Sequence, residues 1–297
     1  MFVHLHVHSA YSLLEGADTE DTLTKAAASR GMPAMALTDT NALHAAVGFY
    51  RAARGAGIKP IFGAEITEGS GPPHPPRHER PLAVLLARDH EGYANLCRII
   101  TLRQMPVASP RGEEEGFSLY EALGKHGSGL FVLSGREEVL EKIRPVVPDG
   151  SLFVELVHQG GGEGGRRVRL LAEWARRQGL PPVTTNDVHF VDPRGYHTHR
   201  ILAAIRTLRT VGTLPARWTA HPSAWLLPSR GMERLFRGEP EALKNTLRIA
   251  EACNVEMEVG RVRFPCGGGG RGGGGVAAGG GGGCGGGGGG WGPPPAG

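Results

Sequence analysis

The stretch His4-Leu5-His6-Val7-His8-Ser9 stands at the start of the chain and alternates imidazole with apolar side chains. A β-strand points alternate side chains to the same face, so the three histidines are expected on one face and the apolar residues on the other, against a core. Far along the chain, Asn186-Asp187-Val188-His189 repeats the same spacing of polar groups. One His-x-His is weak evidence, but two such strands together suit Zn²⁺ or Mn²⁺. The sequence therefore predicts a metal site where the two strands meet.

Composition sets broad limits on the kind of protein. The chain has 297 residues, of which 40% are hydrophobic, and a formal charge of +4. This mildly basic balance permits contact with nucleic acid without requiring it. Its 4 cysteines are too scattered for a disulfide framework or a Cys-x-x-Cys zinc site, which favours a reducing compartment. No segment has the length and apolarity of a signal peptide or membrane span, so we expect a cytoplasmic protein without membrane contact.

Short apolar segments alternate with helical ones along most of the chain. The expected strands are Val3–His8, Ala34–Asp39, Pro60–Ile66, Leu82–Ala87, Leu130–Ser134, Leu152–Val157 and Val183–Asp187. The expected helices are Thr22–Arg30, Ala42–Ala56, Glu91–Gln104, Glu137–Arg144, Arg166–Gln178, Tyr196–Thr210 and Pro240–Cys253. This alternation predicts a parallel sheet, either a barrel or an open doubly wound sheet. We favour the barrel, because closure makes the first and last strands neighbours and its active sites lie at strand C-terminal ends.

The predicted organisation has three parts. Residues 1–221 form the barrel that carries the metal site, and residues 222–265 form a small helical appendix. Residues 266–297 are almost all glycine and cannot bury enough apolar surface to offset their conformational entropy, so this tail is expected to be disordered. The tail is either a flexible linker or RNA-contacting segment or, as we favour, a truncated or frame-shifted end of a GC-rich gene. Pro72–Arg80 is expected to be a surface loop.

Several longer motifs carry a family resemblance. They are His4–Ala17, Ala36–Asn41, Gly57–Glu65, Gly92–Arg98, Thr185–Phe190, Pro240–Thr246, Ile249–Val255 and Arg263–Pro265. In this order they resemble the PHP (polymerase and histidinol phosphatase) domain at the N-terminus of bacterial DNA polymerase III alpha subunits, replicative or error-prone. The resemblance implies a distorted (β/α)7 TIM-like barrel and, in intact members, a three-metal cluster that hydrolyses phosphate esters. In some of these polymerases the domain supplies a 3′→5′ exonuclease.

The resemblance also implies the ligands and where this chain departs from them. The matching ligand positions are His6, His8, Glu15, Asp39, Glu65, Asp187 and His189, with Glu65 as the bridging carboxylate and Glu65 and Asp187 expected to serve catalysis. Three positions that usually carry ligands hold Thr40, Leu82 and Arg136. A guanidinium cannot ligate a cation. We therefore expect one or two divalent ions, Zn²⁺ or Mn²⁺, rather than three. Arg136 could clamp a phosphate or replace a lost charge by pairing with a carboxylate, and the second option is slightly favoured.

The sequence is compatible with two functions. The first is the PHP module of a DNA polymerase III alpha-type DNA-directed DNA polymerase (a nucleotidyltransferase of DNA replication), cut before the polymerase core. Its role would be structural, with residual phosphoesterase or 3′→5′ exonuclease activity. Its partners would be the rest of the polymerase and the replisome subunits, with DNA reached through the parent enzyme. The alternative is a free-standing metal-dependent phosphoesterase of the histidinol-phosphatase type, against which the motifs Gly92–Arg98 and Pro240–Val255 argue.

Overall fold

The structure is a computed structural model and describes residues 1–69, 82–105, 116–158, 160–257 and 259. The loop expected at Pro72–Arg80 and the glycine-rich tail at 266–297 lie outside these residues. The helices are α1 (Glu20–Ser29), α2 (Ala46–Ala56), α3 (His90–Gln104), α4 (Leu119–His126), α5 (Glu137–Ile143), α6 (Gly161–Gln178), α7 (Gly195–Arg206), the 3₁₀ turn η2 (Ala216–Trp218), α8 (Ser229–Leu235) and α9 (Pro240–Ala252). The strands are β1 (Ala34–Leu37), β2 (Lys59–Thr67), β3 (Leu82–Ala87), β4 (Leu130–Ser134), β5 (Leu152–Val157) and β6 (Pro182–Thr185).

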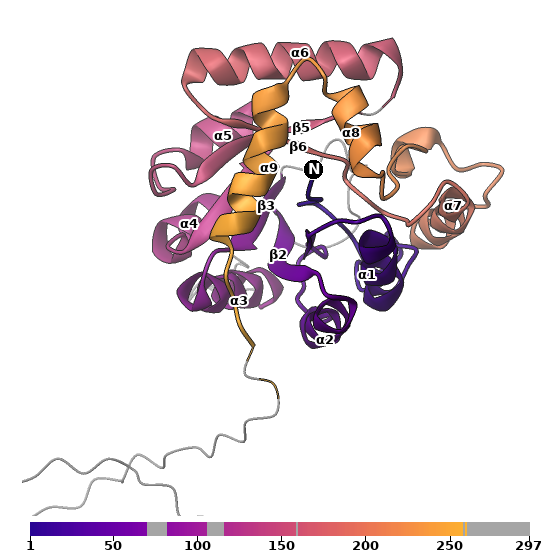
Figure 1. The fold of residues 1–297 in the computed structure, drawn as a ribbon, viewed down its shortest axis with the longest axis horizontal. Coiled ribbons are helices and arrows are strands. Elements are labelled where there is room, and N and C mark those ends of the chain that lie inside the picture. The colour runs from indigo at the N-terminus through magenta and orange to yellow at the C-terminus, as the bar shows by residue number, and fades with distance from the viewer. Residues whose placement is uncertain (70–81, 106–115, 159, 258, 260–297) are drawn as a thin grey trace, which may run out of the picture. The chain divides into compact units, whose positions relative to one another are not determined.

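The strands follow one another in chain order across a six-stranded sheet with helices on its outside (Figure 1). The predicted α/β barrel is confirmed, but the sheet is not wholly parallel. Strand β3 runs antiparallel to both β2 and β4, whereas the remaining pairs are parallel. Parallel neighbours need a crossover of a dozen or more residues, usually a helix. The stretch between β2 and β3 is rich in proline and does not suit one.

The N-terminal segment joins the two edges of the sheet and thereby closes the barrel. On one side the N–H groups of Ala36 and Thr38 donate to the carbonyl oxygens of His4 and Val7, each at 2.8 Å. On the other side Val188 donates to His6 at 3.0 Å and His8 donates to Val188 at 2.8 Å. The first and last predicted strands are therefore neighbours, as expected from closure.

This segment is bulged rather than a regular strand, which corrects the predicted alternation of its side chains. The residues from His4 to Val7 span the same ladder as those from Ala36 to Thr38, so the N-terminal segment carries one extra residue. Leu5 consequently belongs to the inner core cluster, whereas Val7 packs with the outer one. The prediction that His4 shares the face of His6 and His8 was wrong for this reason: the His4 ring bonds the carbonyl oxygen of Leu227 at 2.9 Å.

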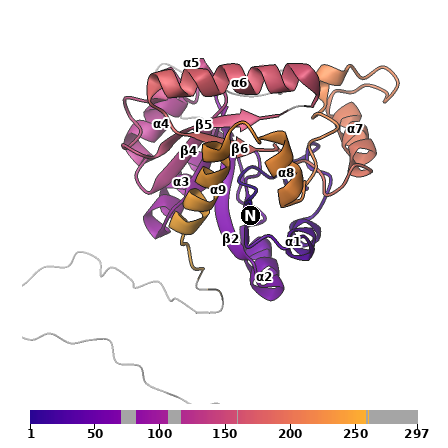
Figure 2. The same cartoon turned by 45° about the horizontal axis from the view of Figure 1, so that its top comes forward.

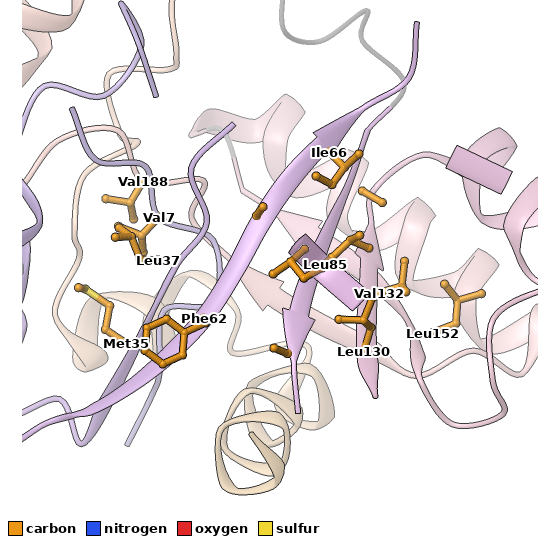
Figure 3. Packing of buried hydrophobic residues seen from close by; sticks show 14 of the residues in the cluster. Val7, Met35, Leu37, Phe62, Ile66, Leu85, Leu130, Val132, Leu152 and Val188 are labelled. Carbon is orange, nitrogen blue, oxygen red and sulfur yellow. The ribbon is translucent and has the colours of Figure 1, made fainter. Parts of the chain in front are cut away.

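Two apolar layers hold the barrel together. The outer layer lies between strands and helices, and Figure 3 shows Val7, Leu37 and Val188 meeting there, with Met35 and Phe62 nearby. The inner layer fills the barrel with residues of every strand and of the N-terminal segment; it comprises Val3, Leu5, Ala34, Ala36, Ile61, Val84, Leu86, Phe131, Leu133, Phe153, Val183, Ile249, Ala250 and Cys253. The barrel is a packed core, so a site can form only at its ends.

Helix α9 covers one of those ends. Its residues Ile249 and Ala250 join the inner layer, and Asn245 donates to the carbonyl oxygen of Pro182, the first residue of β6, at 2.7 Å. Figure 2 shows the helix lying across the strands. Residues Met1–Val259 form one compact unit, so α8 and α9 belong to the same body as the barrel. Within the described residues, the structure contains no helix long and apolar enough to cross a bilayer.

Candidate metal centre

Four buried or nearly buried side chains converge at the end of the barrel opposite α9. The ligand atoms of His6, His8, Glu65 and Asp187 all lie within 4.8 Å of one another. The Nε2 atoms of His6 and His8 are 3.1 Å apart, and Nε2 of His6 is 3.2 Å from Oε2 of Glu65. Oδ1 of Asp187 lies 3.5 Å from Nε2 of His8. Imidazole nitrogen with carboxylate oxygen is a donor set that suits Zn²⁺ or Mn²⁺, so these residues fit a divalent ion.

The local backbone explains how these residues meet. His6 and His8 project from the bulged segment that closes the barrel. Glu65 lies near the end of β2, where its backbone forms an isolated parallel β-bridge with that of Thr40. Asp187 follows β6 with a φ of 44°, a left-handed conformation that is uncommon outside glycine but tolerated by aspartate. Such backbone strain is found preferentially at functional sites. The sequence correctly predicted that the two polar strand ends would meet.

Glu155 on β5 orients His6 and was not predicted as a site residue. Its Oε1 lies 2.7 Å from Nδ1 of His6 and accepts a hydrogen bond from the Thr185 hydroxyl at 2.5 Å. A carboxylate on one ring nitrogen fixes the imidazole so that the other nitrogen faces a metal. The signal was present in the sequence as a single acidic residue inside the apolar strand LFVELV.

The electrostatics of His6 reflect this environment. Burial alone would lower its pKa, but the carboxylates of Glu155, Asp187 and Glu65 outweigh burial and raise the pKa to about 10. The metal-free cluster therefore holds a proton on His6, which stabilises the convergence of negative charge. A divalent cation supplies the same compensation and competes with that proton.

His189 lies at the edge of the cluster. Its ring stacks on His8 with centroids 4.5 Å apart, and its Nε2 is 3.3 Å from Oδ1 of Asp187. His199 on α7 lies behind it, with the two ring centroids 5.2 Å apart. The Nδ1 of His199 is 2.7 Å from the carbonyl oxygen of Glu15, and its Nε2 accepts from the N–H of Ala220 at 2.8 Å. Both ring nitrogens of His199 therefore bond backbone groups, which makes it a structural link.

The structure places Asp39 and Glu15 beside the cluster, with donor groups around them. Asp39 accepts from the N–H and the hydroxyl of Ser9, both at 2.7 Å, and from the Ser12 hydroxyl at 2.6 Å. Burial raises the pKa of Asp39, although these hydrogen bonds favour its charged form. Glu15 pairs with Arg206 at 2.6 Å. The Thr40 hydroxyl lies between Glu15 and the cluster: its oxygen is 3.2 Å from the carboxylate of Glu65 and 3.5 Å from that of Glu15.

A pocket of about 260 Å³ opens beside the cluster. His6, Glu155 and Asp187 line one part of it, and the arginines Arg136, Arg167 and Arg217 line another. Leu82, the first residue of β3, also lines the pocket, so two of the positions where the sequence departs from the expected ligands face this space. Arginine side chains next to a metal-binding cluster suit a phosphate or carboxylate ligand.

Comparisons with known proteins agree with this arrangement. The family model described as "PHP domain" matches residues 4–158. An error-prone DNA polymerase of Symbiobacterium thermophilum is 35% identical over 87% of this chain and 26% of its own length. A DNA polymerase III subunit alpha of Escherichia coli K12 is 34% identical over 90% of this chain and 24% of its own length. The chain thus spans about a quarter of the curated relatives it matches.

Solved structures show weaker likeness. A metal-dependent phosphoesterase described as putative, from Bifidobacterium adolescentis, superposes with a TM-score of 0.45 at 15% identity, covering 63% of this chain and 87% of the other. An amidohydrolase from Chromobacterium violaceum superposes with a TM-score of 0.45 at 19% identity, covering 64% and 88%. The family model and the polymerase relatives carry the assignment: this chain belongs to the PHP domain family, in the form found in DNA polymerase III alpha and error-prone DNA polymerases.

Proposed function

We propose that this chain is the metal-binding PHP module of a DNA polymerase III alpha-type or error-prone polymerase and supports the polymerase structurally. The observation that carries the proposal is the convergence of His6, His8, Glu65 and Asp187 within 4.8 Å in a chain of this family. The partners of such a module would be the rest of the polymerase and the replisome subunits. DNA would be reached through the parent enzyme.

We expect the cluster to hold one or two ions, Zn²⁺ or Mn²⁺. One ion fits the four convergent residues, since each offers one ligand atom to a common point. A second ion would need Glu65 as a bridge together with His189, whose Nε2 is near Asp187. Glu155 would hold His6 in the ligating orientation in either case.

Residual phosphoester hydrolysis is a second candidate function, favoured by the arginines that line the adjoining pocket. Arg136, Arg167 and Arg217 would hold the phosphoryl oxygens of a phosphodiester next to the cluster. A bound divalent ion would supply an activated water and neutralise phosphoryl charge. The substrate would then be a phosphodiester such as a DNA 3′ end, and Glu65 and Asp187 would lie closest to the reaction.

The test measures metal content, thermal stability and hydrolysis on the same preparations. We expect the purified protein to retain Zn²⁺ or Mn²⁺ after dialysis and to lose thermal stability on chelation. The Glu65→Gln variant, which keeps the side-chain volume, is the matched control and should bind no metal. Absence of metal in both proteins would refute the proposed metal-binding role.

Hydrolysis separates the two candidate functions. Metal-dependent cleavage of 3′-mismatched DNA, lost in both Glu65→Gln and Arg136→Gln, would establish the phosphoesterase role. Metal binding without turnover would leave the structural role. Cleavage of small phosphomonoesters in preference to DNA would instead support the free-standing phosphoesterase of the histidinol-phosphatase type.

A further inference from the structure

Glu15 is a buried carboxylate that lies next to the metal cluster without joining it. Glu15 has a side chain only 6% exposed, and one hydroxyl group separates it from Glu65. That hydroxyl belongs to Thr40, whose Oγ1 is 3.5 Å from Oε2 of Glu15 and 3.2 Å from Oε1 of Glu65. The same oxygen is 3.4 Å from Nδ1 of His8. Glu15 is thus close enough for a cation beside Thr40 to feel its charge.

A guanidinium already compensates that charge. Nη1 of Arg206 lies 2.6 Å from Oε1 of Glu15 in an ion pair whose side chains are 15% and 6% exposed. Nη2 of Arg206 donates to the carbonyl oxygen of Trp218 at 2.7 Å, and Nη1 reaches that of Leu14 at 3.5 Å. Three segments of the chain therefore hold the guanidinium in one place: the loop that carries Glu15, the end of α7, and the turn η2.

The local backbone is built to form this contact. Leu14 adopts a left-handed φ of 60°, which is unfavourable for a branched residue and is retained where the surroundings fix it. Arg206 is the last residue of α7, where a positive side chain also complements the negative end of the helix dipole. His199, about two turns earlier on the same helix, accepts the Ala220 N–H and bonds the carbonyl oxygen of Glu15. Helix α7 thus holds Glu15 at two points: His199 bonds the backbone carbonyl oxygen of Glu15, and Arg206 pairs with its carboxylate.

We propose that Arg206 is a built-in cation that neutralises Glu15 and so excludes a further divalent ion from the Thr40 side of the cluster. The inference rests on the proposed metal binding and deepens it, because it sets how many ions the cluster takes. An arginine side chain keeps its charge at all physiological pH values, and a guanidinium repels a divalent ion placed against the same carboxylate. The ions are then confined to His6, His8, Glu65, Asp187 and His189.

The first test asks whether Glu15 is a ligand in the native protein. Glu15→Gln keeps the shape and still offers Arg206 a carbonyl oxygen, so we expect the same number of bound ions per chain as in the wild type. Glu65→Gln, at a residue inside the cluster, should lose metal in the same assay. Fewer ions in Glu15→Gln than in the wild type would overturn the inference, because Glu15 would then be a ligand.

The second test removes the guanidinium. Arg206→Gln leaves Glu15 buried without its compensating charge, so the metal-free protein should melt roughly 10 °C lower. Added Mn²⁺ or Zn²⁺ should restore more stability to this variant than to the wild type, with one more ion bound per chain. Arg206→Lys keeps a cation in place and should gain no ion. The double variant Glu15→Gln with Arg206→Met removes both charges and should also gain none.

These outcomes separate the inference from the proposed function. Metal in the wild type tests the proposed function, whereas the difference between Arg206→Gln and Arg206→Lys tests the role of Arg206. Equal metal content and equal metal-dependent stabilisation in both variants would overturn the inference even if the wild type binds metal. If Arg206→Gln does not fold without metal, the same comparison is made by refolding it in the presence and in the absence of Mn²⁺. Failure to refold under both conditions, together with fewer bound ions in Glu15→Gln than in the wild type, would overturn the inference.

Discussion

Two pairs of carboxylates lie at the same end of the barrel, and their neighbours differ. Glu65 and Asp187 face the imidazoles of His6 and His8, at 3.2 to 3.7 Å. Asp39 and Glu15 face hydrogen-bond donors outside the cluster: the hydroxyl groups of Ser9 and Ser12, and the guanidinium of Arg206. Both pairs look alike in the sequence, as acidic residues at positions that match expected ligands. The difference shows that burial alone does not make an acid a candidate ligand. The groups around the acid decide whether its oxygens face other ligand atoms or already accept hydrogen bonds from other donors.

The largest predicted effect comes from neutralising Glu65, one of the two acids that face the imidazoles. Glu65→Gln should reduce the affinity for Zn²⁺ or Mn²⁺ by more than about 100-fold, because even residues that merely orient a ligand cost 10- to 100-fold when replaced. Glu65 is completely buried and central, so no outside carboxylate can take its place. Isothermal titration of the metal-free protein measures the change. An affinity within threefold of the wild type would place the metal elsewhere.

The pH dependence of stability gives the next largest effect. Burial lowers the pKa of His4 to about 4, whereas the carboxylates around His6 outweigh its burial and raise its pKa to about 10. An unfolded histidine titrates near 6.5. As pH falls from 6.5 to 4, the unfolded chain takes up the His4 proton first, and the metal-free protein loses about 3 kcal/mol from this residue. As pH rises from 6.5 to 10, the folded protein loses the stabilisation that comes from holding a proton on His6, and the free energy of unfolding also falls.

Urea unfolding in a chelator, from pH 4 to pH 9, measures both limbs, and the metal-free protein should be most stable near pH 6.5. In His4→Gln the acid limb should become shallower but persist, because burial also lowers the pKa of His199, to about 3, while the alkaline limb should stay. Added metal should shift the optimum to higher pH, because the ion replaces the proton on His6. An acid limb unchanged in His4→Gln would show that other groups cause it.

The orienting carboxylate gives a smaller effect. Glu155→Gln keeps a hydrogen-bond acceptor for His6 but removes the negative charge that stabilises the ring, so metal affinity should fall by about 10-fold to 100-fold. Thr185→Val, which removes only the hydroxyl that holds Glu155, is the matched milder change and should cost less than Glu155→Gln. A larger loss in Thr185→Val would mean that packing, rather than the charge of Glu155, sets the position of His6.

The sequence predicted the parts of the fold that follow from regular periodicity. The alternation of strands and helices led to a closed barrel, and the spacing of His6, His8, Asp187 and His189 led to the correct meeting of its first and last segments. The strand direction of β3 was missed because the prediction assumed a crossover between every pair of strands. The place of His4 was missed because one extra residue in a bulge reverses which side chains face inward, and a strict alternation does not reveal it.

The candidate site could be predicted less completely, for a physical reason. Motif positions identify residues that come near the site, but they do not give the donors that surround each one. Arg206 lies 191 positions from Glu15 in the sequence, and nothing local links them. Glu155 was hidden in an apolar strand. The partners that separate Glu15 and Asp39 from Glu65 and Asp187 come from distant segments, so only the folded structure displays them.

The smallest predicted effect tests the second pair of acids directly. Asp39→Asn keeps one carbonyl oxygen for Ser9 and Ser12 but loses the charge that strengthens their hydrogen bonds, so unfolding should require about 1 to 2 kcal/mol less free energy. Metal affinity should change by less than threefold, because the carboxylate oxygens of Asp39 accept hydrogen bonds from Ser9 and Ser12 and do not serve as metal ligands. Urea unfolding and metal titration on the same protein give both values. A loss of metal comparable to that of Glu65→Gln, with unchanged stability, would make Asp39 a ligand and would erase the distinction between the two pairs.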